Sequence, residues 1–287
     1  MFDVIIVRYA EIALKGKNRI DFEKRLISNI CKSLTIAGVS FERIKLIRGR
    51  ILVYTSHSCY CLRKVFGISS FSPAISCSID IDTIWKNSEK ILPQLNSKSF
   101  RVSTQRVDKS CAIKSIDVDR EIGSRIVDRT GARVSLKNFD FELCVEIIYG
   151  KAFVFSERIA GPGGLPVGTQ ENVFVSVCDP RGLLSALLLM KRGCSVTPVI
   201  LGSLGKSGDT LLLLNSFGCS TTPIICKNYH EVTGILAGGS GILAIGNSLD
   251  DVSGILEQDL FRDFLILLPC IALSDAVVKV LLDSYAA

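Results

Sequence analysis

VFVSVCDPRGLLSALLLMKRGCSVTPVIL, residues 173–201, is the stretch that decides the fold. It predicts a buried strand over residues 173–177, a helix over 182–192 that ends at Gly193, and a second buried strand over 195–201. The alternation continues downstream, with a helix near 211–217, strands at 222–226 and 242–245, a helix near 250–258, a strand at 264–268 and a closing helix. Such alternation indicates a parallel, doubly wound α/β sheet, with any ligand site at the carboxyl ends of its strands.

The segment before this domain reads GPGGLPVGT, residues 161–169. Four glycines and two prolines in nine residues disfavour both a helix and a central strand, so we expect a linker there. Upstream, the apolar spacing predicts two α+β units. The first has strands at 3–8, 44–47 and 51–54 and a helix from Asn18 to Gly38, and the second has a helix at 115–130 among strands at 74–80, 100–106, 133–136, 142–149 and 152–157. The predicted domains are therefore residues 1–70, 71–165 and 170–287.

Basic residues are concentrated in the first part of the chain. Residues 1–170 hold 27 Lys and Arg against 17 Asp and Glu, whereas residues 171–287 hold 7 against 11. A basic front part favours a polyanionic partner, and nucleic acid is the leading candidate. The eleven cysteines form no CxxC pair and the two histidines lie far apart, so neither a metal site nor histidine catalysis is indicated. No apolar run has the length of a membrane span and the N-terminus lacks a signal peptide, so we expect a cytoplasmic protein without membrane contact.

Several motifs resemble the tRNA 4-thiouridine synthetases, also called tRNA sulfurtransferases. RYAEIALKGKNR at residues 8–19 and VFGI at 65–68 resemble the opening of that family, and QRVDKS at 105–110 and VEI at 145–147 are similar to its THUMP domain, an RNA-binding module. MKRG at 190–193 and GNSLDDVS at 246–253 are similar to its PP-loop domain. The resemblance implies an α+β ferredoxin-like domain and a THUMP domain, followed by the α/β sheet, with tRNA as the partner.

One family motif is missing. The resemblance implies an S-G-G-x-D-S turn before the MKRG helix, where backbone N–H groups hold the pyrophosphate of ATP. This chain has VCDPRG there, residues 177–182, and Pro180 removes an N–H donor while Asp179 adds a carboxylate. Only Arg181 and Gly182 remain as nucleotide-binding candidates in a degenerate site. The chain also stops before the region where the family carries its sulfur-bearing cysteine, and Cys270 lies in an apolar stretch unsuited to that role.

Two other glycine-rich segments are interpreted as structural. GSLGKS at residues 202–207 lacks the glycine spacing of a P-loop, because Ile200 occupies the required position. GGSG at 238–241 is predicted to be a tight turn that shortens a helical segment of the family.

Basic side chains of the front part are the predicted RNA contacts. Those of the predicted helix at 115–130, Arg120, Arg125 and Arg129, have acidic neighbours and are expected to form a balanced, solvated face. The remaining set has few acidic neighbours and is predicted to grip phosphates: Arg8, Lys15, Lys17, Arg19, Arg48, Arg50, Arg101, Arg106, Lys109 and Lys114.

The sequence thus predicts a tRNA-binding protein without catalytic residues or a cofactor of its own. Two alternatives stay open. One is an active tRNA sulfurtransferase that binds ATP in a reorganised site around Arg181 and Lys206. The other is an adaptor whose C-terminal domain docks either a separate modification enzyme or a second copy of the chain and supplies it with tRNA.

Overall fold

The structure is a computed structural model that describes residues 2–47, 49–95, 98–107, 113–202, 208–219, 221–248 and 261–286. The chain forms two compact units that interleave along the sequence. The first comprises Met1–Tyr9, Leu34–Tyr60 and Ser69–Ala160, and the second comprises Ala10–Ser33, Cys61–Ile68 and Gly161–Ala287. Each unit has its own sheet and its own core.

The first unit is built on a mixed sheet with the strand order β2-β3-β1-β4-β8-β7-β5-β6, and β9 pairs with β4. Only β5 pairs in parallel with its neighbours, β6 and β7, and the other pairs are antiparallel. The strands are β1 (Val4–Arg8), β2 (Arg43–Ile47), β3 (Arg50–Tyr54), β4 (Ser70–Cys77), β5 (Ser99–Arg106), β6 (Arg133–Val134), β7 (Phe141–Ile148), β8 (Lys151–Phe155) and β9 (Ile159–Ala160).

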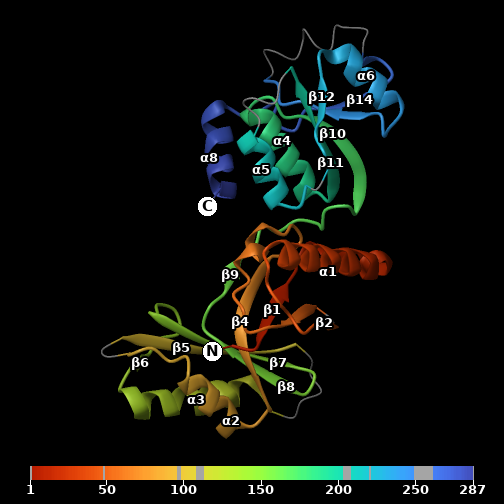
Figure 1. The fold of residues 1–287 in the computed structure, drawn as a ribbon. Coiled ribbons are helices and arrows are strands. Elements are labelled where there is room, and N and C mark those ends of the chain that lie inside the picture. The colour runs from red at the N-terminus through yellow and green to blue at the C-terminus, as the bar shows by residue number, and fades with distance from the viewer. Residues whose placement is uncertain are drawn as a thin grey trace. The chain divides into compact units, whose positions relative to one another are not determined.

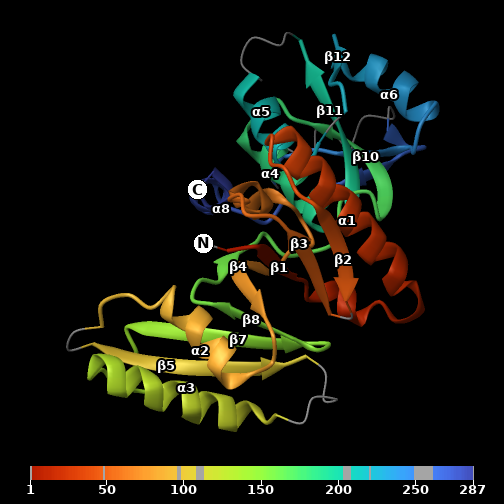
Figure 2. The same ribbon diagram turned by 60° about the horizontal axis from the view of Figure 1, so that its bottom comes forward.

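Two helices, α2 (Ile81–Glu89) and α3 (Ser115–Thr130), cover one face of β5, β7 and β8, as Figure 2 shows. Asp80 caps α2 by accepting a hydrogen bond from the backbone N–H of Thr83 at 2.9 Å. Gly131 ends α3 in the left-handed region, with φ +65°. The helices bury their apolar stripes against alternate residues of β7, such as Leu143 and Val145. The intervening β7 residues therefore point to the opposite face, where the candidate site lies.

The second unit contains a five-stranded parallel sheet with the order β12-β11-β10-β13-β14 (Figure 1). Its strands are β10 (Gln170–Ser176), β11 (Cys194–Leu201), β12 (Ile224–Cys226), β13 (Ile242–Ala244) and β14 (Leu265–Leu267), and its helices after residue 169 are α4 (Pro180–Lys191), α5 (Gly208–Ser216), α6 (Tyr229–Ala237) and α8 (Asp275–Ala286). The chain runs outward from β10 in both directions, so the topological switch point lies between β10 and β13.

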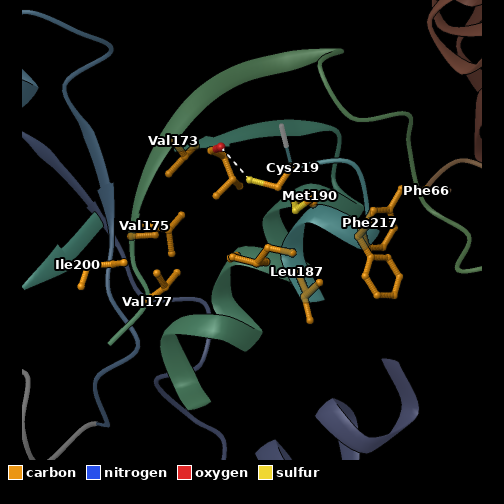
Figure 3. Close-up of a cluster of buried hydrophobic side chains, with 13 residues drawn as sticks. Phe66, Val173, Val175, Val177, Leu187, Met190, Ile200, Phe217 and Cys219 are labelled. Carbon is orange, nitrogen blue, oxygen red and sulfur yellow. Dashed lines mark hydrogen bonds between the residues drawn. The ribbon is translucent and has the colours of Figure 1, made fainter. Parts of the chain in front are cut away.

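Helices cover both faces of this sheet, each over its own core. On one face, α4, α5 and α8 bury residues such as Leu187 and Leu214, and on the other α6 buries Val232 and Leu236. Phe66 joins the first of these cores from the early part of the chain and stacks on Phe217, with ring centroids 5.3 Å apart (Figure 3). The core of the second unit therefore includes a residue, Phe66, that precedes most of the first unit in the sequence.

The early segments of the second unit are helical. They are the α-helix α1 (Arg19–Ile36) and the 3₁₀ helices η1 (Glu11–Leu14), η2 (Gly16–Asn18) and η3 (Tyr60–Lys64). The last turn of α1 and the first residue of η3 belong to the first unit. None of the helices among the described residues is long and apolar enough to cross a membrane.

Most predicted strands and helices are present, including the parallel sheet. The short helix α6 and the two-residue strand β9 were not predicted. Asn228 caps α6 by accepting a hydrogen bond from the N–H of Glu231 at 3.1 Å, and this Asn-x-x-Glu spacing is the signal that reveals the helix in the sequence. The predicted helix at 250–258 lies outside the described residues, and the domain boundaries at residues 70, 165 and 170 stay a prediction.

Candidate nucleic-acid interface

A pocket of about 330 Å³ opens on the face of β5 and β7 that α2 and α3 leave uncovered. Neighbouring residues of the two strands stand side by side there, because Arg101 pairs in register with Glu142, and Gln105 with Glu146. The pocket is lined by Arg101, Ser103, Gln105, Glu142, Cys144, Val145, Glu146, Phe155 and Arg158. Charged and polar groups thus concentrate on one face of β5 and β7, whereas the face covered by α2 and α3 is apolar.

Glu146 is the charged group at the centre of this face, and its side chain is only 1% exposed. Its Oε1 accepts a hydrogen bond from Nε of Arg8 at 2.8 Å, and its Oε2 accepts one from Nε of Arg50 at 2.9 Å. A third guanidinium, that of Arg158, approaches Oε1 at 4.0 Å. One carboxylate is therefore surrounded by three positive charges from different strands and loops.

Arg8 does not lie on the surface that the sequence predicted. It is 5% exposed, donates from Nη1 to the hydroxyl of Ser72 at 2.9 Å, and lies over the ring of Phe155 at 5.0 Å. Burial lowers the pKa of Arg8 below its ordinary value, and the Glu146 carboxylate opposes that shift. Arg8 therefore supports the site from inside instead of meeting a phosphate.

The other predicted contacts of the first unit lie nearer to solvent. Arg101 pairs with Glu142 at 2.5 Å and keeps a third of its side chain exposed. Arg50 extends past Glu146 and donates from Nη2 to Oε1 of exposed Gln105 at 3.3 Å. Arg106 donates to the carbonyl of Ile113 at 3.0 Å, which turns it toward the chain that follows β5.

Three further predicted contacts of the first unit remain. Lys114 is exposed at the N-cap of α3, whereas Arg48 and Lys109 lie outside the described residues.

Three predicted contacts belong to the second unit, so the structure does not join them with the pocket into one face. Lys17 is exposed, and the ammonium of Lys15 lies 4.9 Å from the ring centroid of Phe22. Arg19 forms an ion pair with Glu23 at 2.7 Å on the first turns of α1. These three residues form a basic group on the second unit, separate from the pocket on the first.

Two of the three arginines of α3 have carboxylate partners, and Arg120 is exposed. Arg125 pairs with Glu121 at 3.0 Å and with Asp82 at 2.7 Å, and Arg129 pairs with Glu89. Two of these acids come from α2, not from the sequence neighbours that suggested a balanced face. Because they lie with α2 and α3 on the far face of the sheet, they provide a matched control for the pocket.

The N-terminus of α4, where the sequence predicted a degenerate nucleotide site, is capped by the residue that precedes the helix. Asp179 caps the helix by accepting a hydrogen bond from the N–H of Gly182 at 2.7 Å, and Pro180 at the first helical position has no N–H to offer. Gly246, from the loop after β13, lies against this turn so closely that an added Cβ would lie 2.5 Å from the carbonyl carbon of Arg181. The backbone of residues 181 and 182 is therefore packed directly against the loop that follows β13.

Arg181 turns toward the chain that precedes α8. Its guanidinium donates to Oδ1 of Asp275 at 2.8 Å, to the carbonyl of Leu273 at 2.8 Å and to the carbonyl of Cys270 at 3.1 Å. The Cys270 side chain is fully buried, and burial raises the pKa of its thiol, which disfavours the reactive thiolate. Arg181 and Cys270 thus connect the start of α4 with the residues that precede α8.

Replacing Arg181 by glutamine tests that structural role. We expect the variant to lower the free energy of unfolding by about 1–3 kcal/mol, because two backbone carbonyls and one carboxylate lose their donor. Urea unfolding followed by circular dichroism measures the change. An unchanged midpoint would show that Arg181 does not hold the turn and is available for another task.

Sequence reasoning missed Glu146 and Arg158 as site residues. The alternation of Glu142, Cys144 and Glu146 along β7 is the signal that places polar groups on one face, but it does not tell which arginines meet them. Among the described residues, no cluster of His, Cys, Asp and Glu could hold a metal ion.

Comparison with known proteins places these features in one family. The family model described as the ThiI ferredoxin-like domain matches residues 4–72, and the THUMP domain model matches residues 80–157. The probable tRNA sulfurtransferase of Thermococcus kodakarensis is 35% identical over 210 residues, which cover 69% of this chain and 55% of that protein. That of Methanocaldococcus jannaschii is 34% identical over 204 residues, covering 66% and 53%. The chain spans about half the length of the curated relatives it matches.

Solved structures agree with the fold. The crystal structure of PH1313 from Pyrococcus horikoshii has a TM-score of 0.86 at 29% identity and covers 99% of this chain and all of that one. A 4-thiouridine synthetase solved as an RNA complex with bound ATP has a TM-score of 0.80 at 23% identity, covering 99% and 85%, and supports the fold alone. The predicted fold class is confirmed: ferredoxin-like and THUMP domains precede an α/β domain. With its domain models and its curated relatives in agreement, the chain belongs to the tRNA sulfurtransferase family.

Proposed function

We propose that this chain is a cytoplasmic tRNA-binding protein that grips RNA phosphates with the arginines of its THUMP sheet. The observation that carries the proposal is the charge balance around the pocket. Four guanidiniums, those of Arg8, Arg50, Arg101 and Arg158, face only two carboxylates, those of Glu142 and Glu146. The surplus positive charge is the feature that a phosphate backbone would balance.

The direct contacts in this proposal are Arg101 and Arg158, which line the pocket and are partly exposed, and Arg50, whose 14% exposed side chain meets Gln105 at the pocket. Arginine suits the role because its planar guanidinium can donate to a carboxylate on one side and to a phosphate on another. Lys114 extends the set on the first unit. Lys15, Lys17 and Arg19 would form a second contact on the second unit, with Lys17 the most exposed of the three.

We also propose that the chain does not adenylate tRNA. Two features of the N-terminus of α4 support this: Pro180 has no N–H to offer and the N–H of Gly182 is taken by Asp179, so fewer donors are available to a pyrophosphate, and Gly246 packs against the same turn. The thiol of Cys270 is buried, so it would not carry sulfur. In this proposal the chain delivers tRNA to a separate modification enzyme, which co-purification with tRNA present would detect.

Two measurements on the purified chain test the proposal. We expect tRNA to bind at low salt and to dissociate as salt rises, because the contacts are to phosphates. We expect no tRNA-dependent release of pyrophosphate from ATP, because the α4 turn cannot hold the nucleotide.

Either measurement can contradict its own part of the proposal. Formation of 4-thiouridine from ATP and a sulfur donor by this chain alone would favour the active sulfurtransferase. Failure to bind tRNA at low salt would remove the central claim. The whole chain is needed in both, since a cut at residue 169 would separate Phe66 from the core it shares with Phe217.

A further inference from the structure

Glu146 is a buried carboxylate with a larger charge around it than it can neutralise. Its two oxygens each accept from a different guanidinium, Arg8 through Oε1 and Arg50 through Oε2. Arg158 lies 4.0 Å from Oε1, and more than half of its side chain is exposed. The three arginines come from β1, from β3 and from the residues after β8, so a single side chain organises three separate segments.

The three arginines differ in what they can reach. Arg8 is enclosed, with Ser72 and the ring of Phe155 around its guanidinium. The Arg50 side chain is 14% exposed, and its Nη2 meets exposed Gln105 at the pocket. Glu146 therefore has one partner that is enclosed, Arg8, one that is largely buried but extends to the pocket, Arg50, and one that is mostly exposed, Arg158.

Holding a long side chain in one geometry before RNA arrives lowers the entropy that binding must remove. The guanidinium of an arginine is planar, so anchoring its Nε also fixes the directions in which its terminal N–H groups point. Arg50 is held in this way: its Nε donates to Glu146, its Nη1 to the carbonyl of Gly49 at 2.8 Å, and its Nη2 to the exposed Gln105 at 3.3 Å.

We propose that Glu146 is a positioning residue for RNA binding, which orients Arg50 and Arg158 toward the phosphates without touching RNA itself. The inference rests on the proposed tRNA binding. Glu146 is acidic, and it lies on a surface that must attract a polyanion. The inference therefore predicts that removing this negative charge weakens RNA binding, the opposite of what net charge alone predicts.

Replacing Glu146 by glutamine separates positioning from net charge. The change removes one negative charge, so by electrostatics alone the variant should bind tRNA more tightly than the wild type. If Glu146 positions the arginines, we expect about ten-fold weaker binding at ~0.1 M salt and a flatter slope of log K against log salt, because about one phosphate contact is lost. Filter binding or fluorescence anisotropy over a salt series measures both, at a temperature where circular dichroism shows the variant folded.

Glu89→Gln is the matched control. Glu89 also pairs with an arginine, Arg129, but it belongs to α2 on the far face of the sheet. The same change of charge there should leave the affinity unchanged or slightly stronger. Glu146→Gln that binds as tightly as this control, or more tightly than the wild type, would overturn the inference.

A second variant covers the risk that Glu146→Gln fails to fold with Arg8 buried opposite a neutral amide. The double change Arg8→Met and Glu146→Met removes both buried charges and leaves the net charge as it is, and apolar replacement of a buried ion pair is often well tolerated. We again expect about ten-fold weaker binding, because Arg50 and Arg158 lose their anchor. Wild-type affinity in this double variant would overturn the inference while leaving the proposed function intact, whereas a wild type that binds no tRNA removes both.

Discussion

Replacing Arg101 and Arg158 together by glutamine weakens tRNA binding about 30-fold at ~0.1 M salt, because two phosphate contacts each contribute somewhat under one unit to the slope of log K against log salt. Both side chains line the pocket and both reach solvent. The slope itself should fall by about 1.5 in the double variant. A salt series of binding isotherms on folded proteins measures the affinity and the slope together.

The control for this double variant is Arg125→Gln with Arg129→Gln. It removes the same charge from arginines that also hold carboxylate partners, but on the helical face of the same sheet. We expect a loss of less than about 3-fold, through long-range charge alone. Equal losses in the two double variants would show that diffuse charge, and not the pocket, attracts the RNA.

Replacing Gly246 by alanine unfolds or severely destabilises the second unit, by about 3 kcal/mol or more. The added Cβ would overlap the backbone nitrogen of Gly182 and lie 2.5 Å from the carbonyl carbon of Arg181. Neither atom is at the end of a flexible side chain, so the turn at the start of α4 would have to move. Thermal or urea unfolding followed by circular dichroism gives the size of the loss.

Gly234→Ala is the matched control for that substitution. Gly234 lies inside α6, and a Cβ built there meets no atom within 4 Å. Alanine favours the helix, so we expect this variant to gain about 0.5–1 kcal/mol. If Gly246→Ala were equally harmless, the turn at α4 would be loose enough to open, and the argument against a nucleotide there would fail.

Much of the fold could be predicted from local sequence, since buried strands and amphipathic helices carry their own periodicity. The parallel sheet after residue 169 follows from the alternation in 173–201, and Gly131 marks the end of α3 as expected. The interleaving of the two units could not be predicted, because it depends on contacts such as the stacking of Phe66 on Phe217. Periodicity shows which residues are buried but not what buries them.

The candidate site was harder to predict for the same reason. Arg8 ends an otherwise apolar strand and looks like an exposed cation, yet its partner Glu146 lies 138 residues away in the sequence. Charge totals along the chain could not separate arginines that keep solvent contact, such as Arg101 and Arg158, from Arg8, which is enclosed.

The position of Phe66 in the core of the second unit has a consequence for biosynthesis. Its aromatic partners, Phe217 and Tyr285, follow it by more than one hundred and fifty and more than two hundred residues, so they are synthesised well after it. At usual elongation rates, roughly 10–40 s separate the emergence of Phe66 from that of Tyr285. Throughout that interval Phe66 lacks both of its native aromatic neighbours, so we expect this part of the core to close only after Phe217 and Tyr285 have emerged.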